Sequence, residues 1–277
     1  MDIREFPKIE SLFNRGPDHK VIVGEIRCPE FKQIKNWLVT EKVDGTNIRV
    51  SLEGSPVFQE VTTYDAMNLP STGVKQIALS WAVKFYGRTS AAQIPTHLLS
   101  YLQDTFTLER MARLWRGKQG CEFCGGGGQI DVTSFGNPPH SEWVQCGCVE
   151  RYPIVLFGEG YGPKIQKGGG NYRADPSFRL FDVLVNDKWW LDWESVCGIA
   201  ETLEIKTVPE LGNGDTIEEI TEYVRGGIWS RVAYGDCGRD DVLAEGVVAR
   251  TDPYLYDKHG RPLRFKLKTR DFPEVES

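Results

Sequence analysis

Short alternations of hydrophobic and polar residues recur along the chain and predict more strands than helices. Residues 46–52 alternate strictly between the two classes, which is the period of a β-strand. The apolar members are Ile48, Val50 and Leu52, and the polar members are Asn47, Arg49 and Ser51. Residues 36–40 have an apolar centre and predict a short buried strand, so that two strands flank a tight turn at Asp44 and Gly45. Further strands are expected at residues 154–157, 178–185, 244–250 and 263–268.

Helical spacing appears in only a few places. Residues 95–115 predict a helix, because Pro95 stands at its first turn and apolar residues such as Leu98 and Leu102 recur at the helical period. The stretch 53–73 contains glycine, proline, serine and asparagine without a clear period. We therefore expect a loop with strand fragments there.

A second helix is predicted at residues 216–225. Thr216 and Glu219 have the spacing of a capping box, and Gly226 stands where a C-cap glycine would. Many strands and few helices in non-alternating order indicate an α+β fold with largely antiparallel sheets.

Composition and charge limit the function classes. Of the 277 residues, 40% are hydrophobic and 26% charged, which excludes a disordered chain or a fibre. The net charge of −6 argues against coating nucleic acid by bulk charge and leaves room only for a local basic patch. No apolar run is long enough to span a membrane, and the first twenty residues lack the apolar stretch of a signal peptide, so we expect a soluble, cytoplasmic protein.

The segment with the most chemical information is residues 41–47, Glu-Lys-Val-Asp-Gly-Thr-Asn. Lys42 ends a predicted buried strand, and a lysine held in such a place becomes a nucleophile when its surroundings lower its pKa. The same four-residue pattern also fits a hairpin with a surface lysine. Other segments have to decide between the two interpretations.

Four later segments carry charged or aromatic residues within apolar strands. Glu159 ends one such strand among glycines, and Phe181 lies in a strand whose aromatic residues could pack on a base. Glu245 is a single acid in an otherwise apolar strand, where an unpaired carboxylate would be costly. Lys266 and Lys268 share one strand face, opposite two apolar residues, so an anion is expected beside them.

In this order the segments resemble the covalent nucleotidyltransferase superfamily of polynucleotide ligases and RNA capping enzymes. The match is closest to the lysine-adenylylating, nick-sealing RNA ligases of phages and bacteria. It extends from Phe6 to Phe272, and the first motif and the Gly87-Arg88-Thr89 element are similar to the RNA ligase branch. The resemblance implies a nucleotidyltransferase fold (ATP-grasp-like ligase catalytic), with a nucleotide pocket between largely antiparallel sheets.

The resemblance further implies ATP-dependent joining of 5′-phosphate and 3′-hydroxyl RNA ends in three steps. Lys42 would attack the α-phosphorus of ATP, the AMP would pass to the 5′-phosphate, and a 3′-hydroxyl would displace it. The implied catalytic residues are Lys42, Asp44, Glu245, Lys266 and Lys268. The implied ATP-binding residues are Glu41, Lys42, Val43, Asn47, Arg88, Glu159, Phe181, Glu245, Lys266 and Lys268.

The implied roles divide by the part of the nucleotide that each residue meets. Glu41 and Val43 lie beside the adenine, with Glu41 near its exocyclic amine, and Phe181 stacks on it. Arg88 and Glu159 approach the ribose.

Other implied roles concern the phosphates, the metal and the nucleophile. Asn47 meets the phosphate or the metal's hydration shell, while Lys266 and Lys268 hold phosphates. Glu245 meets metal or Lys42, and Asp44 orients Lys42 and bound water. Mg²⁺ or Mn²⁺ would be held, directly or through water, by Glu159 and Glu245.

Simpler interpretations of three residues remain open. Phe181 alternates with core residues and fits a structural aromatic, Arg88 fits a surface cation, and Asn47 fits a turn cap. The RNA partner, whether a nicked duplex, a broken tRNA loop or an RNA–DNA hybrid, is expected to meet a basic patch around Arg261, Arg264 and Arg270.

Four of the seven cysteines form two tight pairs within a glycine-rich insert, residues 117–151. These four are Cys121, Cys124, Cys146 and Cys148. They predict a structural Zn²⁺ site of the zinc-knuckle type, although the second pair has one intervening residue where two are usual. His140 is an alternative ligand, and a loop with free thiols is the alternative to a metal site.

Two other functions remain as alternatives. A DNA ligase or a capping enzyme shares the lysine chemistry but usually continues into an oligonucleotide-binding barrel. Only nine residues follow Lys268, so we expect a single domain over residues 1–277 without that barrel. A non-catalytic, zinc-bearing RNA-binding protein is the second alternative.

Overall fold

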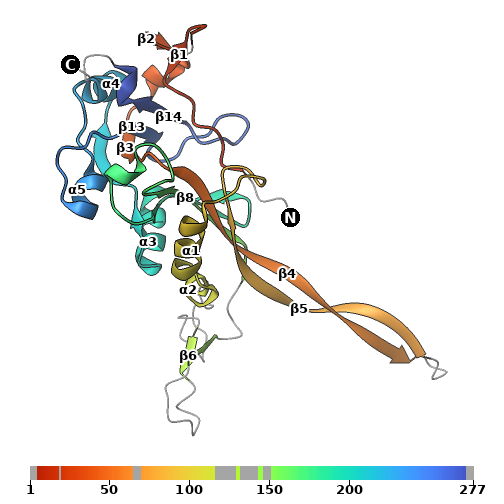
Figure 1. Ribbon diagram of the computed structural model, residues 1–277. Coiled ribbons are helices and arrows are strands. Elements are labelled where there is room, and N and C mark those ends of the chain that lie inside the picture. The colour runs from red at the N-terminus through yellow and green to blue at the C-terminus, as the bar shows by residue number, and fades with distance from the viewer. Residues whose placement is uncertain are drawn as a thin grey trace.

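Two β-sheets face each other, with helices packed on their outer sides (Figure 1). This architecture is seen in a computed structural model, which describes residues 5–18, 20–64, 70–115, 129–131, 143–145 and 151–272. The expectation of a mixed fold with largely antiparallel sheets is confirmed.

The larger sheet has six strands in the order β10-β9-β8-β4-β5, with β11 also paired to β9. Every pairing in it is antiparallel except that of β11. Its strands are β4 (Thr46–Tyr64), β5 (Pro70–Tyr86), β8 (Ile154–Tyr161), β9 (Ser177–Val185), β10 (Trp189–Trp190) and β11 (Lys206–Thr207).

The smaller sheet has four antiparallel strands in the order β12-β3-β13-β14. These are β3 (Trp37–Lys42), β12 (Glu210–Gly214), β13 (Gly246–Thr251) and β14 (Arg264–Lys268). Two further pairs of short strands are β1 (Phe13–Arg15) with β2 (Val21–Ile26), and β6 (Gln129–Asp131) with β7 (Trp143–Gln145).

Each sheet has its own hydrophobic core. Leu98 and Leu102 of α1 and Val196 of α3 pack on the larger sheet, and Ile220 and Val224 of α4 pack on the smaller one. The α-helices are α1 (Thr96–Thr105), α2 (Leu108–Ala112), α3 (Trp193–Thr202), α4 (Ile217–Arg225) and α5 (Arg231–Cys237). Short 3₁₀ helices occupy Pro29–Gln33, Gly169–Asn171 and Thr269–Asp271. None of the helices in the described ranges is long and apolar enough to cross a bilayer.

The two predicted helices fare differently. The one at 216–225 is confirmed as α4, and the hydroxyl of Thr216 accepts the amide of Glu219 as the capping box requires. The one at 95–115 is interrupted at Thr107, whose backbone is extended. The side chain of Thr107 accepts from the amide of Arg110 and so caps the start of a second helix, α2.

The stretch 53–73, expected as a loop with strand fragments, is continuous strand where it is described: residues 53–64 lie in β4 and 70–73 in β5, while 65–69 lie outside the described residues. β4 and β5 remain paired from Arg49 opposite Tyr86 to Tyr64 opposite Pro70, with one register shift at Val57. They form a long two-stranded arm that projects from the body (Figure 1). An arm outside the body has no face against the core, so its strands need no hydrophobic alternation.

The turn at Asp44 and Gly45 connects the two sheets instead of closing a hairpin. The strand before it, β3, belongs to the smaller sheet, and the strand after it, β4, belongs to the larger one. Arg49, on the polar side of β4, is fully buried, and its Nε donates to the carbonyl of Gly87 at 3.0 Å. This chain crossing places the start of β4 opposite the end of β3.

Candidate active site

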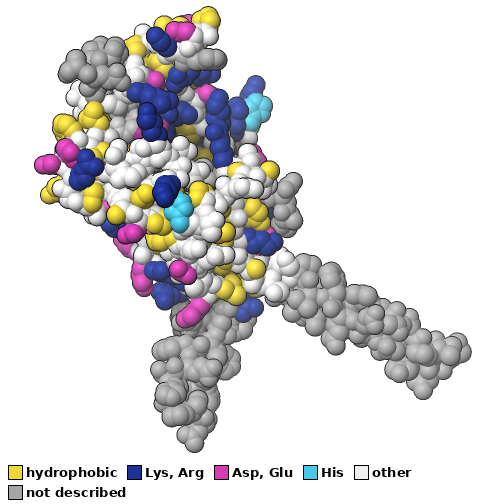
Figure 2. Space-filling view, in the orientation of Figure 1, with side chains coloured by type: hydrophobic (Ala, Val, Ile, Leu, Met, Phe, Trp, Pro, Cys, Tyr) yellow, Lys and Arg dark blue, Asp and Glu magenta, His cyan; other side chains and the backbone are white. Residues whose placement is uncertain are grey.

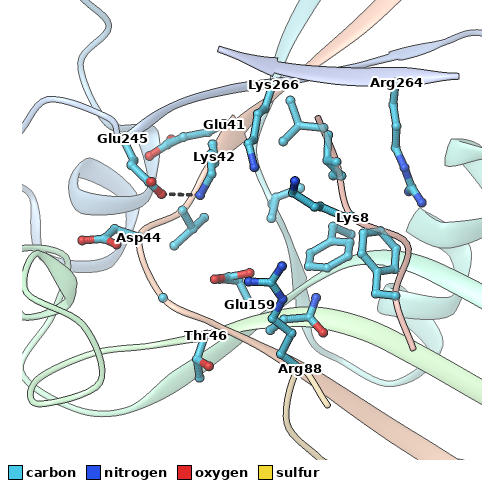
Figure 3. Close-up of a pocket in the computed structure, with 18 of the residues that line it drawn as sticks. Lys8, Glu41, Lys42, Asp44, Thr46, Arg88, Glu159, Glu245, Arg264 and Lys266 are labelled. Carbon is cyan, nitrogen blue, oxygen red and sulfur yellow. Dashed lines mark hydrogen bonds and ion pairs between the residues drawn. The ribbon is translucent and has the colours of Figure 1, made fainter. Parts of the chain in front are cut away.

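A cavity of about 400 Å³ lies between the two sheets, where the chain crosses from one to the other (Figure 3). Every predicted catalytic and ATP-binding residue lines it. These are Glu41, Lys42, Val43, Asp44, Asn47, Arg88, Glu159, Phe181, Glu245, Lys266 and Lys268. The smaller sheet contributes the lysines, and the larger sheet contributes Asn47, Glu159 and Phe181.

Lys42 ends β3, and its ammonium group forms an ion pair with Glu245 (Figure 3). The other oxygen of Glu245 accepts from Nζ of Lys268 at 2.6 Å. The backbone explains the cluster, because Gly246, next to Glu245, pairs with Lys42 on one side and Lys268 on the other. Burial opposes ionisation of Glu245, but the two lysines outweigh it and lower its pKa.

Lys266 lies on the same face of β14 as Lys268, as predicted from the alternation. Its ammonium group has no hydrogen-bond partner among the residues described. Burial, together with the charges of Lys42 and Lys268, lowers its pKa to about 8. An anion entering the cavity would stabilise this charge.

Glu159 faces these lysines from β8. Burial, reinforced by the negative charges of Glu245 and Asp44, raises its pKa to about 8, while Lys42 and Arg88 oppose the shift. Asn47 pairs with Glu159 across the ladder of β4 and β8, and its Oδ1 is buried without a hydrogen bond in the described part of the structure. This side of the cavity therefore presents oxygen atoms that a cation could meet.

Asp44 connects the crossing turn to the loop that follows β8. Its Oδ2 accepts the amide of Gly168 at 3.0 Å, and its own amide donates to the hydroxyl of Tyr172 at 3.2 Å. A Cβ on Gly168 would lie 2.5 Å from that carboxylate oxygen, so a side chain at this position would displace the Asp44 carboxylate from its hydrogen bond. Within the described ranges Asp44 has no hydrogen bond to Lys42, whose orientation it was expected to assist.

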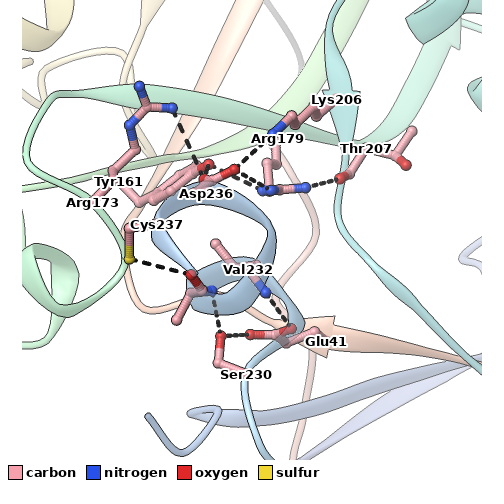
Figure 4. A network of polar contacts seen from close by, with 11 residues as sticks. Glu41, Tyr161, Arg173, Arg179, Lys206, Thr207, Ser230, Val232, Asp236 and Cys237 are labelled. Atoms are coloured by element: carbon pink, nitrogen blue, oxygen red, sulfur yellow. Dashed lines mark hydrogen bonds and ion pairs between the residues drawn. The ribbon is translucent and has the colours of Figure 1, made fainter. Parts of the chain in front are cut away.

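Glu41 directs its carboxylate away from the cavity centre. Its side chain accepts from the hydroxyl of Ser230 at 2.5 Å and from the amide of Val232 at 3.1 Å (Figure 4). The residue is 1% exposed. Burial raises the pKa of Glu41, against the opposing effect of these hydrogen bonds.

A family model described as RNA ligase matches residues 35–268. The chain belongs to the RNA ligase family. Comparison with the curated proteins found no match.

Solved structures of Naegleria gruberi RNA ligase are similar to this chain over most of its length. A lysine-to-alanine mutant with ATP and Mn has a TM-score of 0.48 and 16% identity over 96% of this chain. The same ligase with PPi has a TM-score of 0.47 and 14% identity over 98% of this chain. This RNA ligase family chain matches only 58% and 59% of those two chains.

The structure adds pocket residues to which the sequence assigned no role. Phe6 packs against Phe181, with ring centroids 4.9 Å apart, and Lys8 and Gln166 also line the cavity. The only sequence signal for Phe6 and Lys8 was that the resemblance begins at Phe6. Gln166 lies two residues before the glycines at 168–170, and no sequence pattern singles it out.

The location of Arg264 differs from the prediction that it belongs to an exposed RNA-binding patch. Its side chain is 6% exposed and pairs at 2.8 Å with Asp182, which is 1% exposed. Its guanidinium also lies 4.2 Å from the ring centroid of Phe6. The side chain of Arg264 is therefore buried in the cavity wall, whereas Arg261 and Arg270 are exposed. Its position two residues before Lys266 was the signal that it shares the inward face.

The predicted zinc ligands Cys121, Cys124, Cys146 and Cys148, with the alternative His140, lie outside the described residues. Cys28, Cys197 and Cys237, which lie inside them, are free thiols. The described part of the chain contains no group of three or more His, Cys, Asp or Glu side chains arranged to hold a metal ion.

Proposed function

We propose that this protein is an ATP-dependent RNA ligase that joins 5′-phosphate and 3′-hydroxyl ends through a Lys42–AMP intermediate. The observation that carries the proposal is the ion pair of Lys42 with Glu245, beside the cation of Lys266 and inside a cavity between two sheets. Membership of the RNA ligase family supports it.

In the first step, Nζ of Lys42 loses a proton and attacks the α-phosphorus of ATP. Glu245 is the carboxylate in contact with Nζ and is the nearest acceptor for that proton. The new bond is Nζ–P, and pyrophosphate leaves with the electrons of the broken P–O bond. Lys266 and Lys268 neutralise phosphate charge during the transfer, which is the main requirement of phosphoryl chemistry.

In the second step, an oxygen of the RNA 5′-phosphate attacks the phosphorus of AMP, and the Nζ–P bond breaks. In the third, the 3′-hydroxyl attacks the 5′-phosphorus, loses its proton, and AMP leaves. The substrate class is RNA, either as a nicked duplex or as an RNA–DNA hybrid.

A divalent cation, Mg²⁺ or Mn²⁺, fits the part of the cavity lined by Asn47, Glu159 and Glu245. The raised pKa of Glu159 reflects burial and the nearby carboxylates, and Oδ1 of Asn47 is a buried oxygen without a donor in the described structure. Glu159 and Glu245 would hold the ion directly or through water, with phosphate oxygens completing its shell. The ion would supply charge neutralisation at the phosphates.

The insert at residues 117–151 is proposed to hold one structural Zn²⁺ on Cys121, Cys124, Cys146 and Cys148. The support is the spacing of the thiols and the glycine after Cys124. Four protein ligands would leave no position for a reacting water. Zinc on thiolates needs reduced cysteines, in keeping with a cytoplasmic location. The proposed organisation is one nucleotidyltransferase domain over residues 1–277 that carries this insert.

Incubation with α-labelled ATP or GTP and Mg²⁺, followed by denaturation, tests the proposal. Label from ATP should stay on the protein and should pass to nicked duplex RNA when that is added without further nucleotide. Labelling from GTP alone would indicate a capping enzyme, and transfer only to nicked DNA would indicate a DNA ligase. A protein that takes no label would be non-catalytic.

A further inference from the structure

The short helix α5 (Arg231–Cys237) connects the two walls of the cavity (Figure 4). Its N-terminal end contacts the strand that carries Lys42, and its C-terminal end contacts strands of the larger sheet. Both connections are made by buried carboxylates.

The N-terminal connection is made by Glu41. One carboxylate oxygen accepts from Ser230 and the other from the amide of Val232, at the first turn of α5. The hydroxyl of Ser230 also accepts the amide of Ala233 at 3.0 Å, so it serves the helix and Glu41 together. Ser230 is 2% exposed and does not line the cavity.

The C-terminal connection is made by Asp236, whose side chain is 1% exposed. It accepts from the hydroxyl of Tyr161 at 2.5 Å, and from Arg179 and Lys206 at 2.8 Å each. Tyr161 belongs to β8, Arg179 to β9 and Lys206 to β11, so this end of α5 is bound to three strands of the larger sheet.

Each connection to α5 lies close in sequence to a residue of the active-site cavity. Glu41 directly precedes Lys42 in β3, and Tyr161 follows Glu159 by two residues in β8. We infer that Glu41 is a positioning residue: through Ser230 and α5 it holds Lys42 at its working separation from Glu159. In this assignment the carboxylate of Glu41 is occupied by its hydrogen bonds to Ser230 and Val232, and it does not distinguish the adenine of ATP from the guanine of GTP.

The inference rests on the proposed function, and Ser230→Ala is its sharpest test because Ser230 lies outside the cavity. The measured quantities are kcat and KM for transfer of AMP to Lys42, and the ratio of kcat/KM for ATP and GTP. Loss of one hydrogen bond to a charged group corresponds to about 10- to 100-fold, so kcat should fall by about that factor. The KM for ATP and the ATP/GTP ratio should stay within about threefold.

Conservative variants separate positioning from loss of stability. Ser230→Thr keeps the hydroxyl and should restore most of the kcat. Glu41→Gln can still accept from Val232 and bond to Ser230, so it should keep the wild-type ATP/GTP ratio. Thr221→Ala is the matched control, because it removes another buried hydroxyl, bonded to the carbonyl of Ile217 within α4, and should leave kcat unchanged.

Wild-type kcat in Ser230→Ala would overturn the inference. So would an altered ATP/GTP ratio in Glu41→Gln with a normal ratio in Ser230→Ala, because Glu41 would then read the base. A kcat in Ser230→Thr as low as that in Ser230→Ala, where both variants are folded, would also contradict it. If the wild-type protein takes no label from ATP, the proposed function fails and this inference falls with it.

Discussion

Lys42 and Glu245 lie 203 positions apart in the chain and form an ion pair in the wall of the cavity. The same carboxylate also pairs with Lys268, so two ammonium groups share one negative charge. Lys266, on the same strand face as Lys268, adds a third positive charge nearby. The site is therefore arranged with an excess of positive charge.

Removing either member of this pair should have unequal effects on folding. Lys42→Ala should take no label from ATP. Its free energy of unfolding should nevertheless lie within about 0.5 kcal/mol of the wild-type value, because Glu245 retains its ion pair with Lys268. Glu245→Ala should lower the free energy of unfolding by about 1–3 kcal/mol, because Lys42 and Lys268 then lack their negative partner. Urea unfolding of both variants measures this difference. Equal losses would show that Glu245 does not organise the lysines.

Glu159 should make the ligand-free protein less stable as pH rises. Its pKa is near 8 when folded and near the ordinary value of 4.5 when unfolded, so the folded state holds the extra proton between these values. The contribution of Glu159 to the free energy of unfolding therefore falls as the pH rises from about 4.5 to about 8. Relative to Glu159→Gln, the melting temperature of the wild type should drop by about 10 °C between pH 5 and pH 8.5, since this pKa shift corresponds to about 4 kcal/mol and one kcal/mol corresponds to about 2–4 °C. A constant difference would contradict the raised pKa.

An asparagine at position 44 should still hold the loop that follows β8. The Asp44→Asn variant loses the negative charge but retains an oxygen that can accept the amide of Gly168, whereas Asp44→Ala does not. Trypsin cleavage after the exposed Lys164 and Lys167 should be about tenfold faster in the alanine variant and near the wild-type rate in the asparagine variant. Equal cleavage rates in all three proteins would mean that Asp44 does not anchor this loop.

The arginines of the predicted RNA patch should separate into two classes. Arg264→Ala should cost about 3–5 kcal/mol, because it leaves Asp182 buried without its main charge partner. Arg261→Ala should change stability by less than about 0.5 kcal/mol, since Arg261 pairs with Asp257 at the surface. Denaturant unfolding measures both. Comparable losses would be inconsistent with the buried location of Arg264.

The proposed zinc site should appear in elemental analysis as about one equivalent per chain. Replacing Cys121 with serine should lower that content, while the same change at Cys237, a free thiol in the structure, should not. Labelling of Lys42 should persist after chelation and return of Mg²⁺. A zinc-free protein whose four insert thiols react freely with an alkylating reagent would rule the site out.

Much of the site was predictable because its signals are local. A lysine at a strand end, an acid within an apolar strand, and Lys266 and Lys268 in alternation are all short-range patterns, and each of these residues lines the cavity. The cap of α4 at Thr216 is equally local. By contrast, the arm formed by β4 and β5 was missed, because a ribbon without a core-facing side carries no hydrophobic period.

The sequence by itself determined which side chains of a strand lie on the same face, as with Lys266 and Lys268, because successive residues of a strand alternate between its two faces. Only the tertiary structure decided their partners. Glu41 meets Ser230, Arg264 meets Asp182 and Asp44 meets Gly168 across long stretches of chain. Such pairings depend on how the two sheets are placed against each other, and on the high cost of burying a charge that no distant residue compensates.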